Sequence, residues 1–374
     1  MSLILDGSNG ITFPNSSTQA VGFYGFKNRI INGGMMIDQR YVGASTTNGG
    51  YILDRWQTGN VSGATLTSQQ VADAPAGFQY SFKQTTTVSS TANDYSVIWQ
   101  VVEANNGIDL AWGTSNGQSA TLSFWVKSSV TGQQNACIIY YGPTNYYYFP
   151  TYTINAANTW QYVTITIPAP PTAAGAFAGT LNTAYISVRP VGVFSSGYTN
   201  TGAGNAWTSS ATFKVTGTVN LASTPGATIQ FTGVQLEAGS TATSFDYRPY
   251  GTELALCQRY LPAFNLQSGA HNFGIAMVYN GGSGGQILMP FRFSVQTRVP
   301  PTGVTYTGTA TNLSVFCGST QKYLTGNIAF NDSTNFDAEV VLYSASSGFT
   351  PGYSAVGISE TAASTILYFN GCEL

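Results

Sequence analysis

The chain contains 374 residues with 13 basic and 15 acidic side chains, a formal net charge of -2, and only 7% of its residues are charged. Because a protein neutralises nucleic-acid phosphates or anionic headgroups with clustered lysine and arginine, this balance predicts no nucleic-acid partner and no charge-driven membrane binding. The 42 glycines and 13% aromatic residues favour strands and tight turns over helices, which predicts an all-β protein.

Residues 1–25 are predicted to form a short anchoring segment. Its apolar pieces are brief and are separated by the turn signals Asp6-Gly7, Asn9-Gly10 and Pro14-Asn15. Because so few apolar residues cannot bury a core, we expect its strands to be completed by another chain or by the following domain. No secretory signal is evident, and no stretch has the apolar length that spans a bilayer, so membrane insertion is not expected.

Residues 26–250 contain a run of short strands with the spacing expected of a β-sandwich. Segments such as "SATLSFWVKSS" (119–129), "WQYVTITIP" (160–168) and "ATIQFTGVQLE" (227–237) carry alternating or continuous apolar residues. Polar, glycine-rich or proline-rich linkers separate them. This pattern predicts one sandwich domain.

Residues 251–374 are predicted to form a second, smaller β domain. It begins with a brief helix at "TELALCQRY" (252–260), with Thr252 as its N-cap, and continues with strands such as "GQILMPFRFSV" (285–295) and "FDAEVVLYSA" (336–345). No internal repeat of fixed period is visible, which argues against a β-helix of the kind found in depolymerase tailspikes.

Several motifs resemble those of tailed-bacteriophage tail-fibre and appendage proteins. They are "DGSNGITFPNSSTQ" (6–19), "NRIINGGMMIDQR" (28–40), "YILDRW" (51–56) and "ELALCQRY" (253–260). "VQLEAGSTATSFDYRP" (234–249) is similar to the closing strand of carbohydrate-binding-module jelly rolls. One departure is Gly34, where the phage pattern usually has aspartate, so a partner contact made by that aspartate would be missing here.

The resemblance implies a virion protein made in a host cytoplasm. Its jelly roll would occupy residues 26–250, residues 1–25 would bind other virion proteins, and residues 251–374 would lie distally and face the receptor. It further implies self-association, most simply as a homotrimer, and a glycan or protein receptor on the host surface. No cofactor is expected.

The charged motifs admit two interpretations. In the first, arginine and carboxylate side chains form buried ion pairs that stabilise the fold, because the planar guanidinium matches a carboxylate with two hydrogen bonds and stacks on aromatic rings. In the second, the carboxylates serve sugar binding or acid–base chemistry. The first is favoured, since each carboxylate of the first motifs has an arginine within two residues. The candidate pairing residues are Arg29, Asp38, Arg40, Asp54, Arg55, Asp246, Arg248, Glu253 and Arg259.

Aromatic side chains supply the candidate receptor contacts. Along a strand, Tyr146 and Tyr148 share one face while Tyr147 takes the other, so at least one face of "NYYYF" presents tyrosine rings. Packing of these rings in the sandwich or at a trimer seam is an equal alternative. Trp99, Trp112 and Trp207 are interpreted in the same two ways, and His271 completes the candidates for receptor binding.

Few residues suggest catalysis or metal binding. His271 is the only histidine, and no nucleophile motif lies near it. The carboxylates Asp332, Asp337 and Glu339 leave a calcium ion open, but they lack the regular loop spacing, so no metal is predicted. The four cysteines are too far apart for a zinc motif and are predicted to be buried thiols, with a Cys317 to Cys372 bridge as the alternative.

Four functions remain open at this point, the weakest being a bacterial carbohydrate-binding module, in which the "NGITFP" and "NRIING" stretches would not be needed. The first is a non-enzymatic fibre or spike subunit that attaches a phage to its host. The second is a capsid or tail decoration protein that touches no host. The third, a glycan-degrading tailspike, is disfavoured because neither a repeat nor an unpaired carboxylate dyad is visible.

Overall fold

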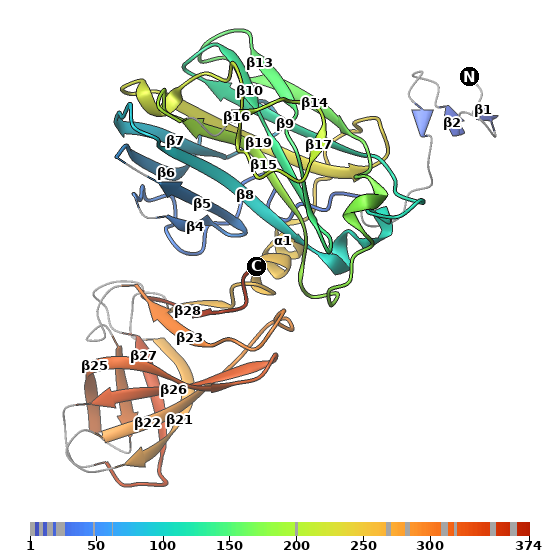
Figure 1. Ribbon diagram of the computed structural model, residues 1–374. Helices are drawn as coiled ribbons and strands as arrows, with labels where there is room; N and C mark the ends of the chain where they lie inside the picture. The colour runs from blue at the N-terminus through green and yellow to red at the C-terminus, as the bar shows by residue number, and fades with distance from the viewer. Residues whose placement is uncertain are drawn as a thin grey trace.

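The computed structural model describes most of the chain, and we refer to this part as the described residues. They comprise 4–6, 10–12, 18–19, 27–47, 49–61, 63–198, 201–266, 271–280, 285–307, 313–317, 320–344, 349–359 and 365–374. Nearly all regular structure among them is β-strand (Figure 1). The predicted all-β fold, a jelly-roll sandwich followed by a smaller β domain, is confirmed.

The N-terminal segment contributes three short strands that pair with one another. They are β1 (Ile4–Asp6), β2 (Gly10–Thr12) and β3 (Thr18–Gln19), in an antiparallel sheet of order β1-β2-β3. Ile4 lies opposite Thr12, and Ile11 lies opposite Gln19. The three strands thus pair with one another, and their completion by another chain or by the following domain stays a prediction.

Two antiparallel sheets build the sandwich. The seven-stranded sheet has the order β17-β12-β11-β15-β8-β5-β4 and the five-stranded sheet the order β14-β9-β19-β7-β6. The former contains β4 (Gly50–Leu53), β5 (Trp56–Val61), β8 (Tyr95–Glu103), β11 (Cys137–Tyr141), β12 (Asn145–Tyr148), β15 (Ala184–Phe194) and β17 (Trp207–Thr208). The latter contains β6 (Thr65–Val71), β7 (Ser81–Val88), β9 (Ala120–Ser128), β14 (Gln161–Ile167) and β19 (Thr228–Ala238).

The sandwich core lies between these two sheets. Phe124 and Phe231 enter it from the five-stranded sheet, and Ile98, Ile138 and Ile186 enter it from the seven-stranded sheet. Burial alternates along β14, as expected for a strand with one face on a core and one on solvent. We call the face of the seven-stranded sheet that points away from this core its outer face.

Smaller elements surround the sandwich. They are β10 (Gly132–Asn135) paired with β13 (Thr151–Ile154), β16 (Thr201–Gly202) paired in parallel with β18 (Lys214–Val215), and the 3-10 helices Ala104–Asn106, Ile108–Leu110, Thr172–Ala174 and Leu221–Ser223. Part of the outer face is covered, because Phe149 and Val215 form a small buried cluster there with Cys137 and Ile139.

The C-terminal region forms a second β body with its own core. Six strands close a barrel of order β21-β22-β26-β25-β24-β27, and β20-β28-β23 form a sheet beside it. Its strands are β20 (Ala263–Leu266), β21 (His271–Asn280), β22 (Gly285–Arg292), β23 (Gly303–Tyr306), β24 (Leu313–Cys317), β25 (Thr320–Ser333), β26 (Asp337–Ser344), β27 (Ser354–Ser359) and β28 (Thr365–Asn370). Met289, Val340 and Phe369 are buried in this core.

Helix α1 (Tyr250–Gln258) lies between the two bodies, and the last residues of the chain return to it (Figure 1). Cys257 and Tyr260 pack with Ile31 and Ile37 in a separate buried cluster. The helix therefore joins the two bodies and does not belong to the barrel alone. Its N-cap is Pro249, so the expected cap at Thr252 is wrong: that residue lies inside the first turn.

All four cysteines are free thiols. Cys137, Cys257 and Cys372 are buried and Cys317 is half-buried, so the proposed Cys317 to Cys372 bridge is absent from the structure. No helix among the described residues has the length and apolar character needed to span a membrane.

Candidate functional site

Of the tyrosines and tryptophans chosen from the sequence, Tyr146, Tyr148, Trp112 and Trp207 pack against the core. Tyr148 lies opposite Ile138 in the β11–β12 pair, so both side chains enter the sandwich core, and Trp112 is only 1% exposed. Tyr146 and Trp207 are partly buried against the same core, and the Trp207 indole N–H donates to the Pro168 carbonyl over 2.9 Å. Receptor contact is therefore wrong for Trp112 and Tyr148, because packing of the sheets buries them.

The remaining receptor candidate from the sequence is not placed in detail. His271 opens β21, but its side chain lies outside the described residues. No role is assigned to it here.

The outer face of the seven-stranded sheet carries Trp99, which the sequence also offered as a candidate, with other aromatic residues. Trp99 on β8 lies opposite Gln57, and Arg189 on β15 lies opposite Cys137. A register shift between Val188 and Val191 places Arg189 beside Trp99 across the β15–β8 pair. We name the half-buried group of Trp99, Tyr141, Arg189 and Phe213 the Arg189 site.

Aromatic rings flank the guanidinium group of Arg189. Its Cζ atom lies 5.3 Å from the ring centroid of Trp99 and 5.1 Å from that of Phe213, both within the range of a cation–π contact. Burial raises the pKa of the Tyr141 hydroxyl, and the charge of Arg189 acts on it in the opposite direction. The site thus combines a fixed positive charge with flat apolar surfaces.

The donors of Arg189 are unused within the described residues. Its Nε and Nη1 atoms are buried, and no hydrogen bond or ion pair to them is formed by any described residue. A buried N–H group without an acceptor costs about 1 to 3 kcal/mol, so this arrangement favours a ligand that supplies acceptors. Arg189 and Lys214 are the only charged residues between Lys127 and Glu237, which was the available sequence signal for this site.

Gly59 on β5 sets the position of the Trp99 ring. A Cβ atom added at Gly59 would lie 2.7 Å from Cη2 and 2.9 Å from Cζ3 of Trp99, closer than carbon atoms approach. Glycine at this position therefore lets the indole lie against the backbone of the neighbouring strand.

We expect the Gly59→Ala variant to displace the Trp99 ring while changing the free energy of unfolding by less than about 1 kcal/mol, because a side chain can move aside. The indole N–H resonance of Trp99 and a denaturation curve measure the two effects. Gly303→Ala is the matched control, since nothing lies within 4 Å of a Cβ atom there. An unchanged Trp99 resonance in Gly59→Ala would contradict the assigned packing.

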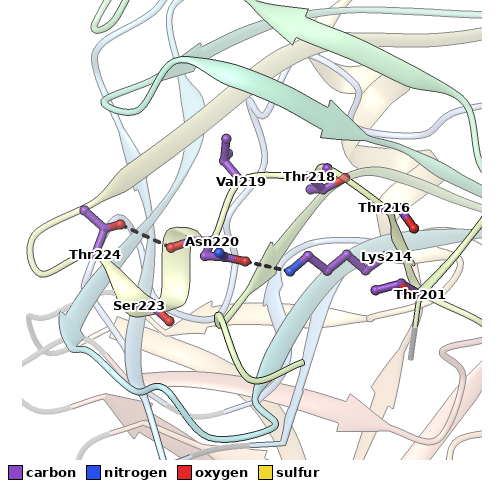
Figure 2. A pocket seen from close by; sticks show the side chains of 9 residues that line it. Thr201, Lys214, Thr216, Thr218, Val219, Asn220, Ser223 and Thr224 are labelled. Carbon is purple, nitrogen blue, oxygen red and sulfur yellow. Dashed lines mark hydrogen bonds between the residues drawn. The ribbon is translucent and has the colours of Figure 1, made fainter. Parts of the chain in front are cut away.

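A hydroxyl-rich hollow lies next to the Arg189 site along the chain, since Phe213 and Lys214 are consecutive. The hollow has a volume of about 650 Å³ and is lined by Thr201, Lys214, Thr216, Gly217, Thr218, Val219, Asn220, Ser223 and Thr224 (Figure 2). The Lys214 Nζ donates to the Asn220 side chain over 2.6 Å and to the Ser195 carbonyl over 3.3 Å. Burial lowers the pKa of Lys214. Both acceptors are neutral, so the positive charge of the lysine is not cancelled.

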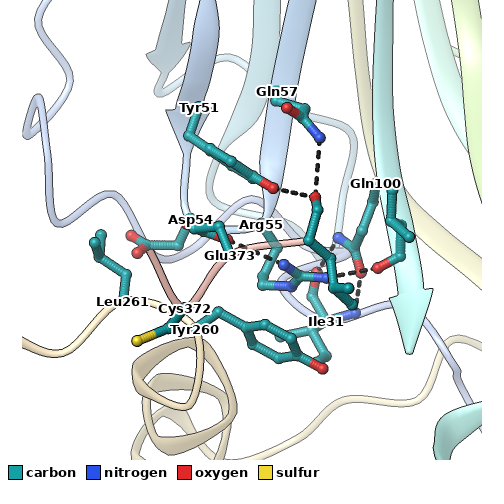
Figure 3. Close-up of polar contacts among 12 residues, drawn as sticks. Ile31, Tyr51, Asp54, Arg55, Gln57, Gln100, Tyr260, Leu261, Cys372 and Glu373 are labelled. Atoms are coloured by element: carbon teal, nitrogen blue, oxygen red, sulfur yellow. Dashed lines mark hydrogen bonds and ion pairs between the residues drawn. The ribbon is translucent and has the colours of Figure 1, made fainter. Parts of the chain in front are cut away.

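The charged motifs of the sequence meet at the junction between the two bodies. Arg40 and Arg55 both bind Glu373, over 2.9 Å and 3.0 Å respectively. The guanidinium of Arg55 also stacks on Tyr260, 3.6 Å from its ring centroid, and donates to the Val101 carbonyl (Figure 3). These contacts connect residues near the start of the sandwich to Glu373, which follows the last strand, β28.

Other arginines add to the same junction. Arg259 binds Glu103 over 2.6 Å, and Arg298 donates to the carbonyls of Asn182, Cys372 and Glu373. The charges therefore hold the sandwich, α1 and the C-terminal segment together.

The partners of the paired residues differ in part from those expected. Arg29 binds Asp109, Arg259 binds Glu103 and not Glu253, and Arg248 lies 3.5 Å from Asp246 and 3.4 Å from Glu253. Of the local pairs, Asp246 with Arg248 is present. The other arginines reach carboxylates that are distant in sequence.

Asp38 and Asp54 do not form the expected ion pairs. Asp38 accepts the backbone N–H groups of Tyr41 and Gly43, over 3.0 Å and 2.7 Å. Asp54 is buried and accepts the backbone and side-chain N–H groups of Gln39, over 2.7 Å and 2.9 Å. Both carboxylates are held by hydrogen bonds inside the structure.

The acidic residues of the barrel bind neighbouring polar groups. Glu339 accepts from Asn331 over 2.6 Å, Asp337 accepts from the Thr334 hydroxyl over 2.6 Å, and Asp332 accepts the N–H of Ser333. Within the described residues, no three His, Cys, Asp or Glu side chains group as metal ligands would.

Solved structures with a related sandwich share little sequence with the chain. No family model matches it, and no curated protein matches it in sequence. The enzymatically active domain of tailspike protein 4 from bacteriophage CBA120 is 15% identical, with a TM-score of 0.33 over 57% of this chain and 21% of that one. The chain thus spans about a fifth of that tailspike domain.

Carbohydrate-binding modules are similar at the same level. The family 11 module of a cellulosomal cellulase from Clostridium thermocellum is 12% identical, with a TM-score of 0.28 over 54% of this chain and 98% of the module. The xylan-binding CBM22-1 domain from Paenibacillus barcinonensis is 9% identical, with a TM-score of 0.24 over 53% and 95%. At these scores the similarity says nothing about ligand or activity.

Proposed function

We propose that this chain is a non-enzymatic bacteriophage virion protein, a fibre or spike subunit that attaches the particle to glycans on the host surface. The observation that carries glycan binding is the Arg189 site, where two guanidinium nitrogens have no partner among the described residues and two aromatic rings contact the group. The virion location rests on the resemblance of the "NGITFP", "NRIING" and "LDRW" stretches to phage fibre proteins.

The chemistry of the site suits a sugar ring. The apolar faces of Trp99 and Phe213 offer rigid contact area to the C–H face of a pyranose, and Arg189 donates hydrogen bonds to its oxygen atoms. Single sites of this kind bind weakly. Presentation of several copies on one particle, as in the homotrimer we propose, raises the overall affinity through effective concentration.

The other parts of the chain have supporting roles in this proposal. Residues 1–25 bind other virion proteins, and the charged junction fixes the sandwich relative to the barrel. The barrel lies distally and brings its own loops to the host surface. Because Asp38 and Asp54 are engaged in internal hydrogen bonds, we assign them no catalytic role.

We expect the purified, fluorescently labelled protein to bind host cells and to compete with phage infection. Trp99→Ala lowers cell binding by about tenfold, because it removes a central aromatic contact. Tyr162→Ala is the control, since this exposed tyrosine lies on β14 of the other sheet. Binding is measured by flow cytometry before and after periodate oxidation of the surface glycans.

The alternatives give different results in the same assay. A protein that neither binds cells nor blocks infection is a decoration protein, and the proposal is then wrong. Release of new reducing ends from host polysaccharide would instead identify a glycan-degrading enzyme.

A further inference from the structure

We propose that the Arg189 site selects sugars that bear a carboxylate, such as uronic acids, over neutral sugars. This inference rests on the proposed function, because it names the class of glycan that the same site takes. It is drawn from the charges around Arg189, the geometry of its guanidinium group and the hollow beside it.

Among the described residues, no carboxylate forms an ion pair with Arg189. The stretch from residue 128 to residue 236 contains no carboxylate, and it supplies β11, β12 and β15, as well as Phe213. The nearest acidic residues along β8 are already engaged. Asp94 accepts the N–H groups of Gly63 and Ala64, and Glu103 binds Arg259.

A second cation, Lys214, follows Phe213 in the chain and lines the hydroxyl-rich hollow. The acceptors of its Nζ among the described residues, the Asn220 side chain and the Ser195 carbonyl, are neutral. An unpaired positive charge raises the local concentration of anionic ligands.

The planar guanidinium group suits a carboxylate more than a hydroxyl group. A charge-assisted hydrogen bond from an arginine to a carboxylate is about twice as strong as one to a neutral oxygen atom. A sugar hydroxyl offers only a neutral oxygen atom to the same group. Trp99 and Phe213 both contact the guanidinium and so restrict its orientation.

The hollow gives the bound glycan room to continue. Its lining includes the hydroxyl groups of Thr216, Thr218, Ser223 and Thr224, which donate to or accept from sugar hydroxyls (Figure 2). The acidic unit therefore occupies the Arg189 site, and neighbouring units of the polysaccharide extend toward Lys214.

The test uses the full chain and a panel of immobilised bacterial surface polysaccharides. Each acidic polysaccharide is presented in its native form and with its carboxyl groups reduced to primary alcohols, beside neutral polysaccharides and a polyglutamate peptide. We expect the native acidic forms to bind at least about tenfold more tightly than their reduced forms, as lost charge-assisted bonds predict. Polyglutamate is expected not to bind, since it lacks a ring to stack on Trp99.

Variants locate the selectivity. Arg189→Gln is expected to remove the preference for native over reduced forms, while binding to reduced forms changes less than about twofold. Arg189→Lys retains the positive charge but lacks the planar guanidinium group, and it is expected to keep only part of the preference for native over reduced polysaccharides. Arg292→Gln removes an exposed arginine from the barrel and is the charge-matched control.

The two proposals fail in distinguishable ways. If native and reduced forms bind equally, or Arg189→Gln keeps the preference, the acidic-sugar inference is overturned and glycan binding stands. If no polysaccharide binds in any form, both proposals are wrong. Binding of polyglutamate as tightly as of acidic glycans would show a general anion site and overturn the inference.

Discussion

We expect the Glu373→Gln variant to lose about 3 to 5 kcal/mol of stability, because removing one partner of a buried ion pair leaves the opposite charge uncompensated. Here two cations, the half-buried Arg40 and the buried Arg55, share the single carboxylate over 2.9 Å and 3.0 Å. Glutamine preserves the shape and one acceptor oxygen but removes the charge. We expect the junction to open before either β core unfolds. Both arginines belong to the sandwich and Glu373 follows the last strand, so the lost ion pairs connect the two bodies and lie in neither core.

Trypsin sensitivity reports the opening of this junction. Arg298 donates to the carbonyls of Cys372 and Glu373, so cleavage after it requires that the C-terminal segment leave its place. We expect faster cleavage at Arg298 in Glu373→Gln and a lower denaturant midpoint. Asp332→Asn removes an exposed carboxylate of the barrel and is expected to stay within about 0.5 kcal/mol of the natural protein. Equal cleavage and equal midpoints in both variants would show that the ion pairs contribute nothing to the junction.

Much of the fold follows from local sequence patterns. Strands, turns and the two-body division are encoded in short stretches, as along β14, where burial alternates residue by residue. The charged "IDQR" and "LDRW" motifs indicated internal ion pairs correctly for Arg40 and Arg55 but wrongly for Asp38 and Asp54. The shared partner of the two arginines did not follow from sequence, because Glu373 lies more than 300 residues away and only the folded chain brings it near.

The site was harder to predict, because it depends on which side of a sheet meets the core. Alternation placed Tyr146 and Tyr148 together and Tyr147 opposite, and this division holds in the structure. Which set is buried depends on the pairing of β12 with β11 and on the second sheet. The register shift in β15, which brings Arg189 to Trp99, likewise cannot be predicted from the local sequence.

The second large expected effect is a pH dependence of the free energy of unfolding, caused by the ionisation of Asp54. Burial raises the pKa of its carboxyl group to about 7, although Arg40 and the hydrogen bonds from Gln39 act to lower it. In the unfolded chain the group ionises near pH 4, while in the folded chain it stays protonated up to about pH 7. The folded state therefore binds the extra proton between these values, so the contribution of Asp54 to stability falls as pH rises from about 4 to about 7 and is constant above.

We expect Asp54→Asn to abolish this decline. Near pH 4 the variant and the natural protein have similar stability, and above pH 7 the variant is more stable by up to about 4 kcal/mol, because an amide cannot ionise. The side-chain amide of Gln39 can turn and present its oxygen to the new amide N–H, which preserves one of the two present hydrogen bonds. The difference between the two proteins in urea unfolding, measured from pH 4 to pH 8, isolates Asp54 from other carboxyl groups.

The coupling of Asp54 to Glu373 supplies a further check on the same measurement. The charge of Glu373 raises the pKa of Asp54 and that of Arg40 lowers it, so in the Glu373→Gln background Asp54 becomes more acidic. The pH range over which the stability difference between Asp54→Asn and its parent develops then ends at a lower pH, and the difference above that range becomes smaller. A difference curve that is flat from pH 4 to pH 8 in the natural background would mean that Asp54 is ionised throughout and that hydrogen bonds from Gln39 outweigh its burial.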